Sequence, residues 1–209
     1  MRKLKRDSRF ARKFGIISLS LVFLALAFSS IIGTTQAALI FTDNFDDGVI
    51  DAAKWKIGIL SRSSTQFDSS IVVKEQNGRL SITPRASASG SFYGGYVSAS
   101  AANLTDSAAS VEAAQKTTGN AATIFSVGID KDNWFGFRAK GSSLFLESRK
   151  AGSTTTVSLA YSAVQHRFWR LRHNPIDGTI VFETSADGTA WTARRTIARQ
   201  ITITAVKIE

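Results

Sequence analysis

The chain has 209 residues, 44% of them hydrophobic, which is enough for one all-β domain with a full core. It contains no cysteine, and this excludes disulfides, thiolate metal sites and a cysteine nucleophile. The net charge of +10 does not indicate a nucleic-acid partner, because seven of the 26 Lys and Arg lie in residues 1–37 and the others form no basic run.

Residues 1–37 have the three-part pattern of an export signal. A basic head, residues 1–13, precedes the uncharged apolar residues 14–33, and Thr35-Gln36-Ala37 then places small residues where a signal peptidase reads them. We expect cleavage before Ala38. The alternative is a retained membrane anchor helix over residues 14–33, since about 20 apolar residues can span a bilayer. Either way, residues 38–209 are predicted to be secreted or extracytoplasmic.

The first half of residues 38–209 predicts short strands separated by turn residues. Asn77-Gly78 favours a tight hairpin, and Pro84 ends the strand that follows it. The Ser-, Ala- and Gly-rich residues 86–95 predict a loop, and residues 51–55 a single helical turn. Strands are expected at residues 39–45, 56–60, 71–74, 79–83, 95–100 and 108–115.

The second half is organised around residues 122–174, where apolar and polar residues alternate between turns. Such period-two patterning predicts an antiparallel meander with one buried face. Together with the earlier segments, the expected strands exceed ten, which predicts one antiparallel β-sandwich or barrel and no second domain. Residues 205–209 stop in mid-strand, so we also expect a frayed last strand or a shortened chain. The strands of this half are expected at residues 122–129, 134–138, 144–147, 154–159, 167–173, 179–184, 190–197 and 203–208.

Several motifs in this order resemble concanavalin A-like lectin/glucanase domains of the laminin-G-like, non-catalytic bacterial type. They are residues 45–51 (FDDGVID), 76–80 (QNGRL), 127–138 (VGIDKDNWFGFR), 168–172 (FWRLR) and 184–192 (TSADGTAWT). The resemblance covers residues 38–209 and implies a two-sheet jelly roll in an exported, often carbohydrate-binding protein. Glucanases of this family carry Glu-x-Asp-x-x-Glu on one strand. None of the five glutamates of this chain stands in that pattern, so we expect no enzyme activity.

Two further motifs are expected to be structural. Residues 185–191 (SADGTAW) resemble an Asp-box hairpin, in which Asp187 binds turn amides and Trp191 folds back over the turn. His166 and His173 lack the neighbouring ligands that a zinc site needs.

A calcium site is one interpretation of Asp43, Asp46 and Asp47, which cluster where a lectin-like fold can hold the ion between its first and last strands. Calcium takes six to eight oxygen ligands, and carboxylates with turn carbonyls can supply them. The alternative, which we favour, is a polar turn in which these carboxylates bind backbone amides.

A sugar-binding face is the one functional surface that the pattern supports. An aromatic ring can stack on the apolar face of a sugar while charged groups bind its hydroxyls. Strand alternation supplies both kinds of side chain, although a solvated face with cross-strand ion pairs gives the same pattern. The candidate carbohydrate-binding residues are Trp134, Arg138, Glu147, Arg149, Arg170 and Arg172.

The sequence therefore predicts an exported, non-catalytic β-sandwich that binds carbohydrate or cell-surface glycan. A structural module of the cell envelope without a small ligand is the alternative. A glycoside hydrolase with a diverged site is the third hypothesis.

Overall fold

The computed structural model describes residues 41–85 and 90–209, and all of its regular structure apart from one short 3-10 helix is β-strand. The predicted signal or anchor, residues 1–37, lies outside the described residues, as does the expected start of the first strand. In the described part of the chain, no helix combines the length and apolar character needed to cross a membrane. The fold is therefore all-β, as the alternation predicted.

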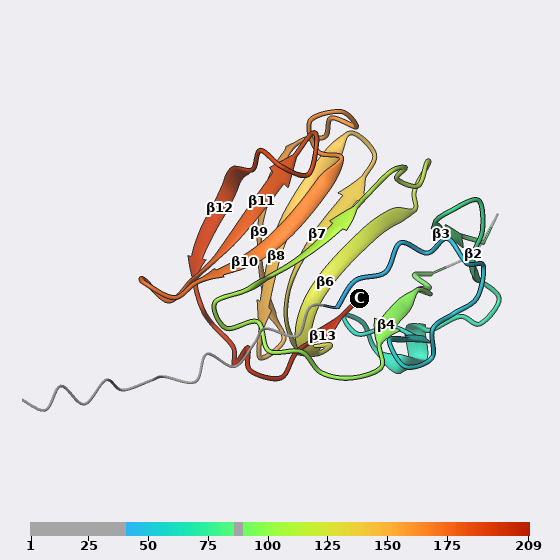
Figure 1. Cartoon of the computed structure of the whole chain (residues 1–209), viewed down its shortest axis with the longest axis horizontal. Helices are drawn as coiled ribbons and strands as arrows, with labels where there is room; N and C mark the ends of the chain where they lie inside the picture. Colours follow the sequence, from blue (N-terminus) through green and yellow to red (C-terminus); the bar gives the residue numbers. More distant parts are fainter. Residues whose placement is uncertain (1–40, 86–89) are drawn as a thin grey trace, which may run out of the picture. The chain divides into compact units, whose positions relative to one another are not determined.

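Two antiparallel sheets form the main body of the fold (Figure 1). One has the order β12-β11-β10-β5 and the other β13-β6-β7-β8-β9. The four-stranded sheet consists of β5 (Ala108–Glu112), β10 (Phe168–Asn174), β11 (Thr179–Ser185) and β12 (Thr192–Ala198). The five-stranded sheet consists of β6 (Ala122–Asp130), β7 (Asn133–Lys140), β8 (Ser143–Lys150), β9 (Ser153–Ala160) and β13 (Lys207–Ile208).

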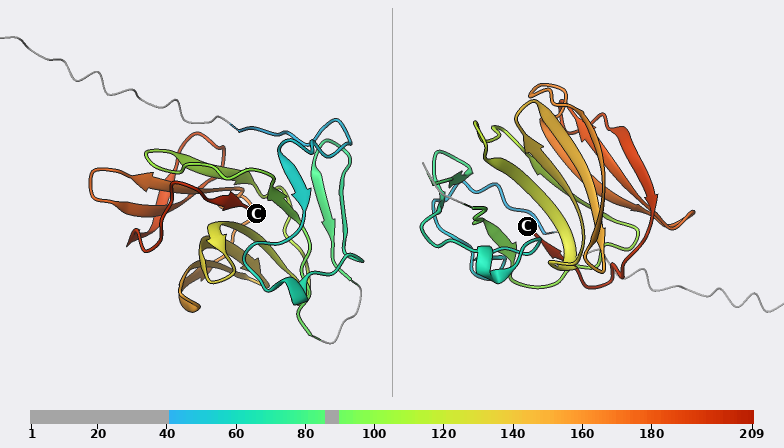
Figure 2. Two further views of the ribbon diagram at one scale, coloured as in Figure 1. Left: turned by 90° about the horizontal axis from the view of Figure 1, so that it is seen from below. Right: turned by 180° about the vertical axis from the view of Figure 1, so that it is seen from behind.

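The inner faces of these sheets share one hydrophobic core. Phe137 of β7 stacks on Trp169 of β10 with ring centroids 5.6 Å apart, and Phe182 of β11 meets Phe137 edge-on at 5.5 Å. All three side chains are fully buried. Large rings contribute most to the stability of such a core, because the free energy gained on folding increases with the apolar area that is removed from water. Figure 2 shows the two layers from further sides, with β6 to β9 in yellow-green to light orange and β10 to β12 in orange and red.

A smaller part precedes these sheets in sequence and contains two strand pairs, β1-β4 and β2-β3. Asn77 and Gly78 both take positive φ, at 54° and 68°, and form the tight turn between β2 and β3 that the sequence predicted. The bounds are β1 (Trp55–Ile57), the 3-10 helix η1 (Ser64–Gln66), β2 (Val72–Glu75), β3 (Leu80–Thr83) and β4 (Tyr96–Ser98).

The two ends of residues 38–209 depart from the expected strands. Residues 41–45 carry no strand, because the side chain of Asp43 binds the amide of Phe45 and bends the chain there. The last strand is only the two residues Lys207 and Ile208, paired with β6. The pairing with β6 continues to the last residue, since Glu209 and Ser126 exchange two backbone hydrogen bonds of 2.8 and 2.9 Å. The expectation of a frayed end was wrong.

Candidate functional site

The six residues proposed for sugar binding lie on two different sheets. Trp134, Arg138, Glu147 and Arg149 belong to β7 and β8 of the five-stranded sheet, whereas Arg170 and Arg172 belong to β10 of the four-stranded sheet. Their neighbours in sequence, such as Phe137 and Trp169, fill the core between the sheets. By strand alternation, the two groups therefore lie on opposite outer faces of the sandwich. Our expectation that they meet on one face was wrong.

Trp134 is not available as a sugar platform. Its side chain is only 3% exposed, and its indole Nε1 donates to the carbonyl oxygen of Lys131 at 3.0 Å. The guanidinium of Arg62 lies 5.4 Å from the ring and also 4.9 Å from the ring of Tyr93. Trp134 also fills the space beside Gly128, where an added Cβ would lie 2.4 Å from the Cβ of Trp134. The ring therefore belongs to the packed structure.

The other three residues of that face form local ion pairs. Arg138 binds Glu147 through Nη2 at 2.6 Å and through Nε at 3.1 and 3.2 Å, and its guanidinium lies 4.0 Å from the ring of Phe145. Arg149 reaches Asp132 at 3.2 Å. Glu147 is only 6% exposed. The face holds a charged pair under a partly exposed phenylalanine ring.

The outer face of the four-stranded sheet holds a related cluster with a tryptophan. Arg170 stands directly opposite Glu183 in the antiparallel register of β10 and β11, and its Nε donates to Oε2 at 2.6 Å. Arg172 donates to both oxygens of the same carboxylate, at 3.1 to 3.3 Å. The guanidinium of Arg170 lies 4.0 Å from the ring centroid of Trp191, which is partly exposed. We call Arg170, Arg172, Glu183 and Trp191 the Trp191 cluster.

The charges of the Trp191 cluster stabilise each other. Burial by itself raises the pKa of Glu183, but hydrogen bonds from Arg172 and Arg170 outweigh it and lower that pKa. The hydrogen bonds that Arg172 donates to Glu183 raise the pKa of Arg172. Glu183 is therefore ionised at neutral pH, although only 5% of the residue is exposed. It holds two guanidinium groups in fixed positions beside an aromatic ring.

Sequence reasoning missed Trp191 and Glu183. The Asp-box turn itself is confirmed: Asp187 accepts from the amides of Thr189 and Ala190 at 2.8 and 2.9 Å, and these bonds lower its pKa. It is the ring of Phe168, however, that lies against the turn, about 3.3 Å from where a Cβ on Gly188 would stand. Trp191 instead lies over the sheet. The sequence signal that could have indicated this position is the hairpin itself: an antiparallel pair of strands on either side of residues 185–191 brings Trp191 close to Glu183.

The aspartates assigned to calcium accept hydrogen bonds from backbone amides and from neighbouring side chains. Asp43 accepts from the amide of Phe45 at 2.9 Å and from the indole Nε1 of Trp55 at 3.0 Å. Asp46 accepts from the side chain of Asn44, and Asp47 from the amide of Val49. Within residues 41–85 and 90–209, no three His, Asp or Glu side chains are grouped to hold a metal ion. Asp43 and Asp47 thus accept backbone amides, as the alternative of a polar turn expected, and the calcium site stays a prediction.

Both histidines are structural, as expected. The Nδ1 atom of His166 accepts from the amide of Ser162 at 3.0 Å, and that of His173 accepts from the amide of Asp106 at 3.1 Å. Burial is the main cause that lowers the pKa of each ring.

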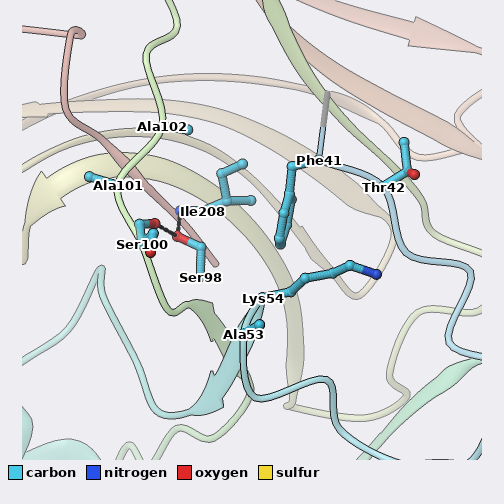
Figure 3. A pocket seen from close by; sticks show the side chains of 9 residues that line it. All are labelled: Phe41, Thr42, Ala53, Lys54, Ser98, Ser100, Ala101, Ala102 and Ile208. Atoms are coloured by element: carbon cyan, nitrogen blue, oxygen red, sulfur yellow. Dashed lines mark hydrogen bonds between the residues drawn. The ribbon is translucent and has the colours of Figure 1, made fainter. Parts of the chain in front are cut away.

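A hollow of about 380 Å³ lies between the start of the described chain and its end (Figure 3). The ring of Phe41 and the side chain of Ile208 face each other across it. Two of its polar side chains are already engaged: Ser98 Oγ donates to the carbonyl of Ser100 and accepts from the amide of Ile208, and Lys54 pairs with Asp51 at 3.2 Å. The hollow offers a ligand mainly apolar contact, so it is a weaker candidate than the Trp191 cluster.

Comparison with known proteins does not assign the chain to a family. No family model matches it, and no curated protein matches it. One solved structure is similar: a functionally unknown protein from Saccharomyces cerevisiae, at 13% identity and a TM-score of 0.36. The match covers 54% of this chain and 75% of the yeast protein.

Proposed function

We propose that this chain is an exported, non-catalytic sugar-binding module with a jelly-roll fold of the concanavalin A-like kind, and that the Trp191 cluster binds the sugar. The observation that carries the proposal is the stack of Arg170 on Trp191, with the partly exposed ring beside charged hydrogen-bonding groups. One face of the indole rests on the guanidinium, and the ring is partly exposed, so a sugar can contact its exposed part. Glycans commonly bind in this way, because C–H groups contact a ring while hydroxyls take hydrogen bonds from charged groups.

The arrangement of three glutamates, Glu112, Glu147 and Glu183, supports a role without catalysis. Hydrolysis of a glycosidic bond requires two carboxyl groups that flank the bond. Glu147 and Glu183 are each bound to arginine and belong to different sheets, on opposite outer faces. Glu112 pairs with Arg167 at the surface at 2.6 Å.

The test is affinity electrophoresis of the protein through gels that contain a β-glucan, a xylan or polygalacturonate. We expect retardation by at least one polymer, and loss of that retardation in Trp191→Ala. Phe145→Ala is the matched control, because Phe145 is also a partly exposed ring stacked at 4.0 Å on an arginine paired with glutamate, on the opposite face.

Each outcome of this test points to a different conclusion. Loss of retardation in Phe145→Ala alone would move the site to the five-stranded sheet. Unretarded wild-type protein in every gel would refute the proposal and favour the structural module of the cell envelope. Release of reducing sugar from any polymer would support the third hypothesis, a glycoside hydrolase with a diverged site.

A further inference from the structure

We infer that the Trp191 cluster selects sugars that carry a carboxylate, such as the uronic acids of acidic polysaccharides. The inference rests on the proposed function of this site and adds the chemical class of its ligand. It follows from the charge balance of the cluster, from the hydrogen-bond donors that remain on its arginines and from their exposure.

The cluster has two guanidinium groups and one carboxylate. Arg170 and Arg172 both bind Glu183, so the three groups together carry one positive charge. Beside the start of β10, Arg167 forms an ion pair with Glu112, so the charges of these two residues cancel. At the other end, Asp177 accepts hydrogen bonds from the side chains of Asn174 and Thr179. After Glu183, the charge of Asp177 also acts on Arg172 and raises the pKa of that residue. The cluster itself therefore carries one positive charge more than its own carboxylate offsets, and Asp177 attracts Arg172 from the end of the strands.

Donors remain on both arginines after Glu183 is satisfied. Arg170 gives Glu183 only its Nε, and within residues 41–85 and 90–209 neither of its terminal nitrogens has a hydrogen-bond partner. Arg172 uses Nε and Nη2, and the same part of the chain offers its Nη1 no acceptor. The side chains are 23% and 37% exposed, whereas that of Glu183 is 7% exposed. A ligand therefore meets guanidinium donors, and the carboxylate lies behind them.

Donors of this geometry fit a carboxylate well. A guanidinium presents parallel N–H groups in a plane, which match the two oxygens of a carboxylate, and the bonds are charge-assisted. In a hexuronate the carboxylate is attached to the ring carbon at the edge of the sugar. With the sugar ring over Trp191, its carboxylate can then extend along the sheet toward Arg170 and Arg172.

The experiment compares polygalacturonate with its fully methyl-esterified form, which has the same sugar backbone without the charge. Isothermal titration of the protein at about 0.15 M salt limits long-range attraction, because the Debye length is then about 8 Å. We expect the acid to bind about tenfold more tightly than the ester, since one charge-assisted hydrogen bond contributes about that factor. Trp191→Ala should abolish binding of both polymers.

Arg172→Gln tests the source of the preference, because it removes one guanidinium and leaves Glu183 paired with Arg170. It should reduce the preference for the acid to nearly one. Lys140→Gln is the control, since it removes one positive charge from an exposed position at the end of β7, in the other sheet. An equal loss of acid binding in both variants would show attraction to the net charge of the protein and would overturn the inference.

Further outcomes separate this inference from the proposed function. Equal affinity for acid and ester, with both lost in Trp191→Ala, would overturn the carboxylate preference and leave sugar binding intact. Dextran sulfate bound as tightly as polygalacturonate, with the same dependence on Arg172, would overturn the assignment to carboxylates in favour of anionic sugars in general. Binding of a β-glucan or xylan alone would refute the inference while supporting the module's function.

Discussion

Arg195 of β12 donates a hydrogen bond of 2.6 Å to the carbonyl oxygen of Leu146 in β8, and so connects the two sheets. The same guanidinium also binds the carbonyl and the hydroxyl of Thr155 in β9, and it lies 5.5 Å from the ring of Phe182 in the core. Burial lowers the pKa of Arg195. The edge of the sandwich between β9 and β12 is thus held by one long polar side chain, whereas its centre is held by aromatic rings.

We expect Arg195→Met to lower the free energy of unfolding by about 1–3 kcal/mol. The methionine keeps much of the apolar contact, but the buried carbonyl of Leu146 loses a charged donor. Urea denaturation monitored by tryptophan fluorescence measures the change. Arg199→Met is the control, since Arg199 is exposed, and it should stay within about 0.5 kcal/mol of the wild type. An unchanged Arg195→Met would show that the carbonyl is satisfied without the guanidinium.

Trp134→Ala should reduce the stability of the protein, whereas Trp191→Ala should reduce its sugar binding. Trp134 is 3% exposed, so its removal should cost about 3–5 kcal/mol of stability through a cavity on β7. Trp191 is partly exposed, so its removal should affect sugar binding and cost much less stability. Thermal melting of the two variants beside the wild type decides the matter. A stable Trp134→Ala that loses sugar binding would reverse our assignment of the two rings.

The sequence was sufficient to assign faces within each strand. Alternation correctly divided β7 into Phe135 and Phe137 toward the core and Trp134 and Arg138 away from it. In β10, alternation likewise placed Trp169 toward the core and Arg170 away from it. Turn chemistry also located the hairpin at Asn77-Gly78, because left-handed backbone there is specific to few residues.

The sequence was insufficient to say which strands share a sheet. β7 and β10 are separated by β8 and β9, and alternation carries no information about whether such strands lie in one layer. For the same reason it did not reveal that Arg62, more than 70 residues before Trp134, covers that ring. Long-range packing decides the exposure of an outward-facing residue, and a local pattern does not contain it.

The side chain of Glu209 should contribute to stability through its contacts with residues 60 and 61. Its oxygens accept from the amides of Leu60 and Ser61 at 3.1 and 3.2 Å and from the hydroxyl of Ser61 at 2.5 Å. We expect Glu209→Ala to lower the free energy of unfolding by about 1–3 kcal/mol, since these donors lose their acceptor. Glu209→Gln keeps one oxygen and should lose less. Equal urea midpoints for both variants and the wild type would mean that water replaces the carboxylate without cost.

Stability should fall as the pH drops below neutrality, because of His166 and His173. Each ring accepts a backbone amide at Nδ1, so a proton at that atom would break the hydrogen bond. Burial lowers both pKa values from the ordinary 6.5, so the unfolded chain takes up protons that the folded protein does not.

The sign follows from linkage, since stability rises with pH wherever the unfolded state binds more protons. The contribution of the two rings is therefore complete above pH 6.5 and is lost as the pH falls from there through the lower pKa values of the folded state. Urea midpoints at pH 7.5, 6.0 and 5.0 should decrease in that order. His173→Gln should make the decrease smaller, whereas exposed Lys140→Gln should leave it unchanged. A midpoint that is constant from pH 7.5 to 5.0 would show that the folded protein protonates these rings as easily as the unfolded chain does.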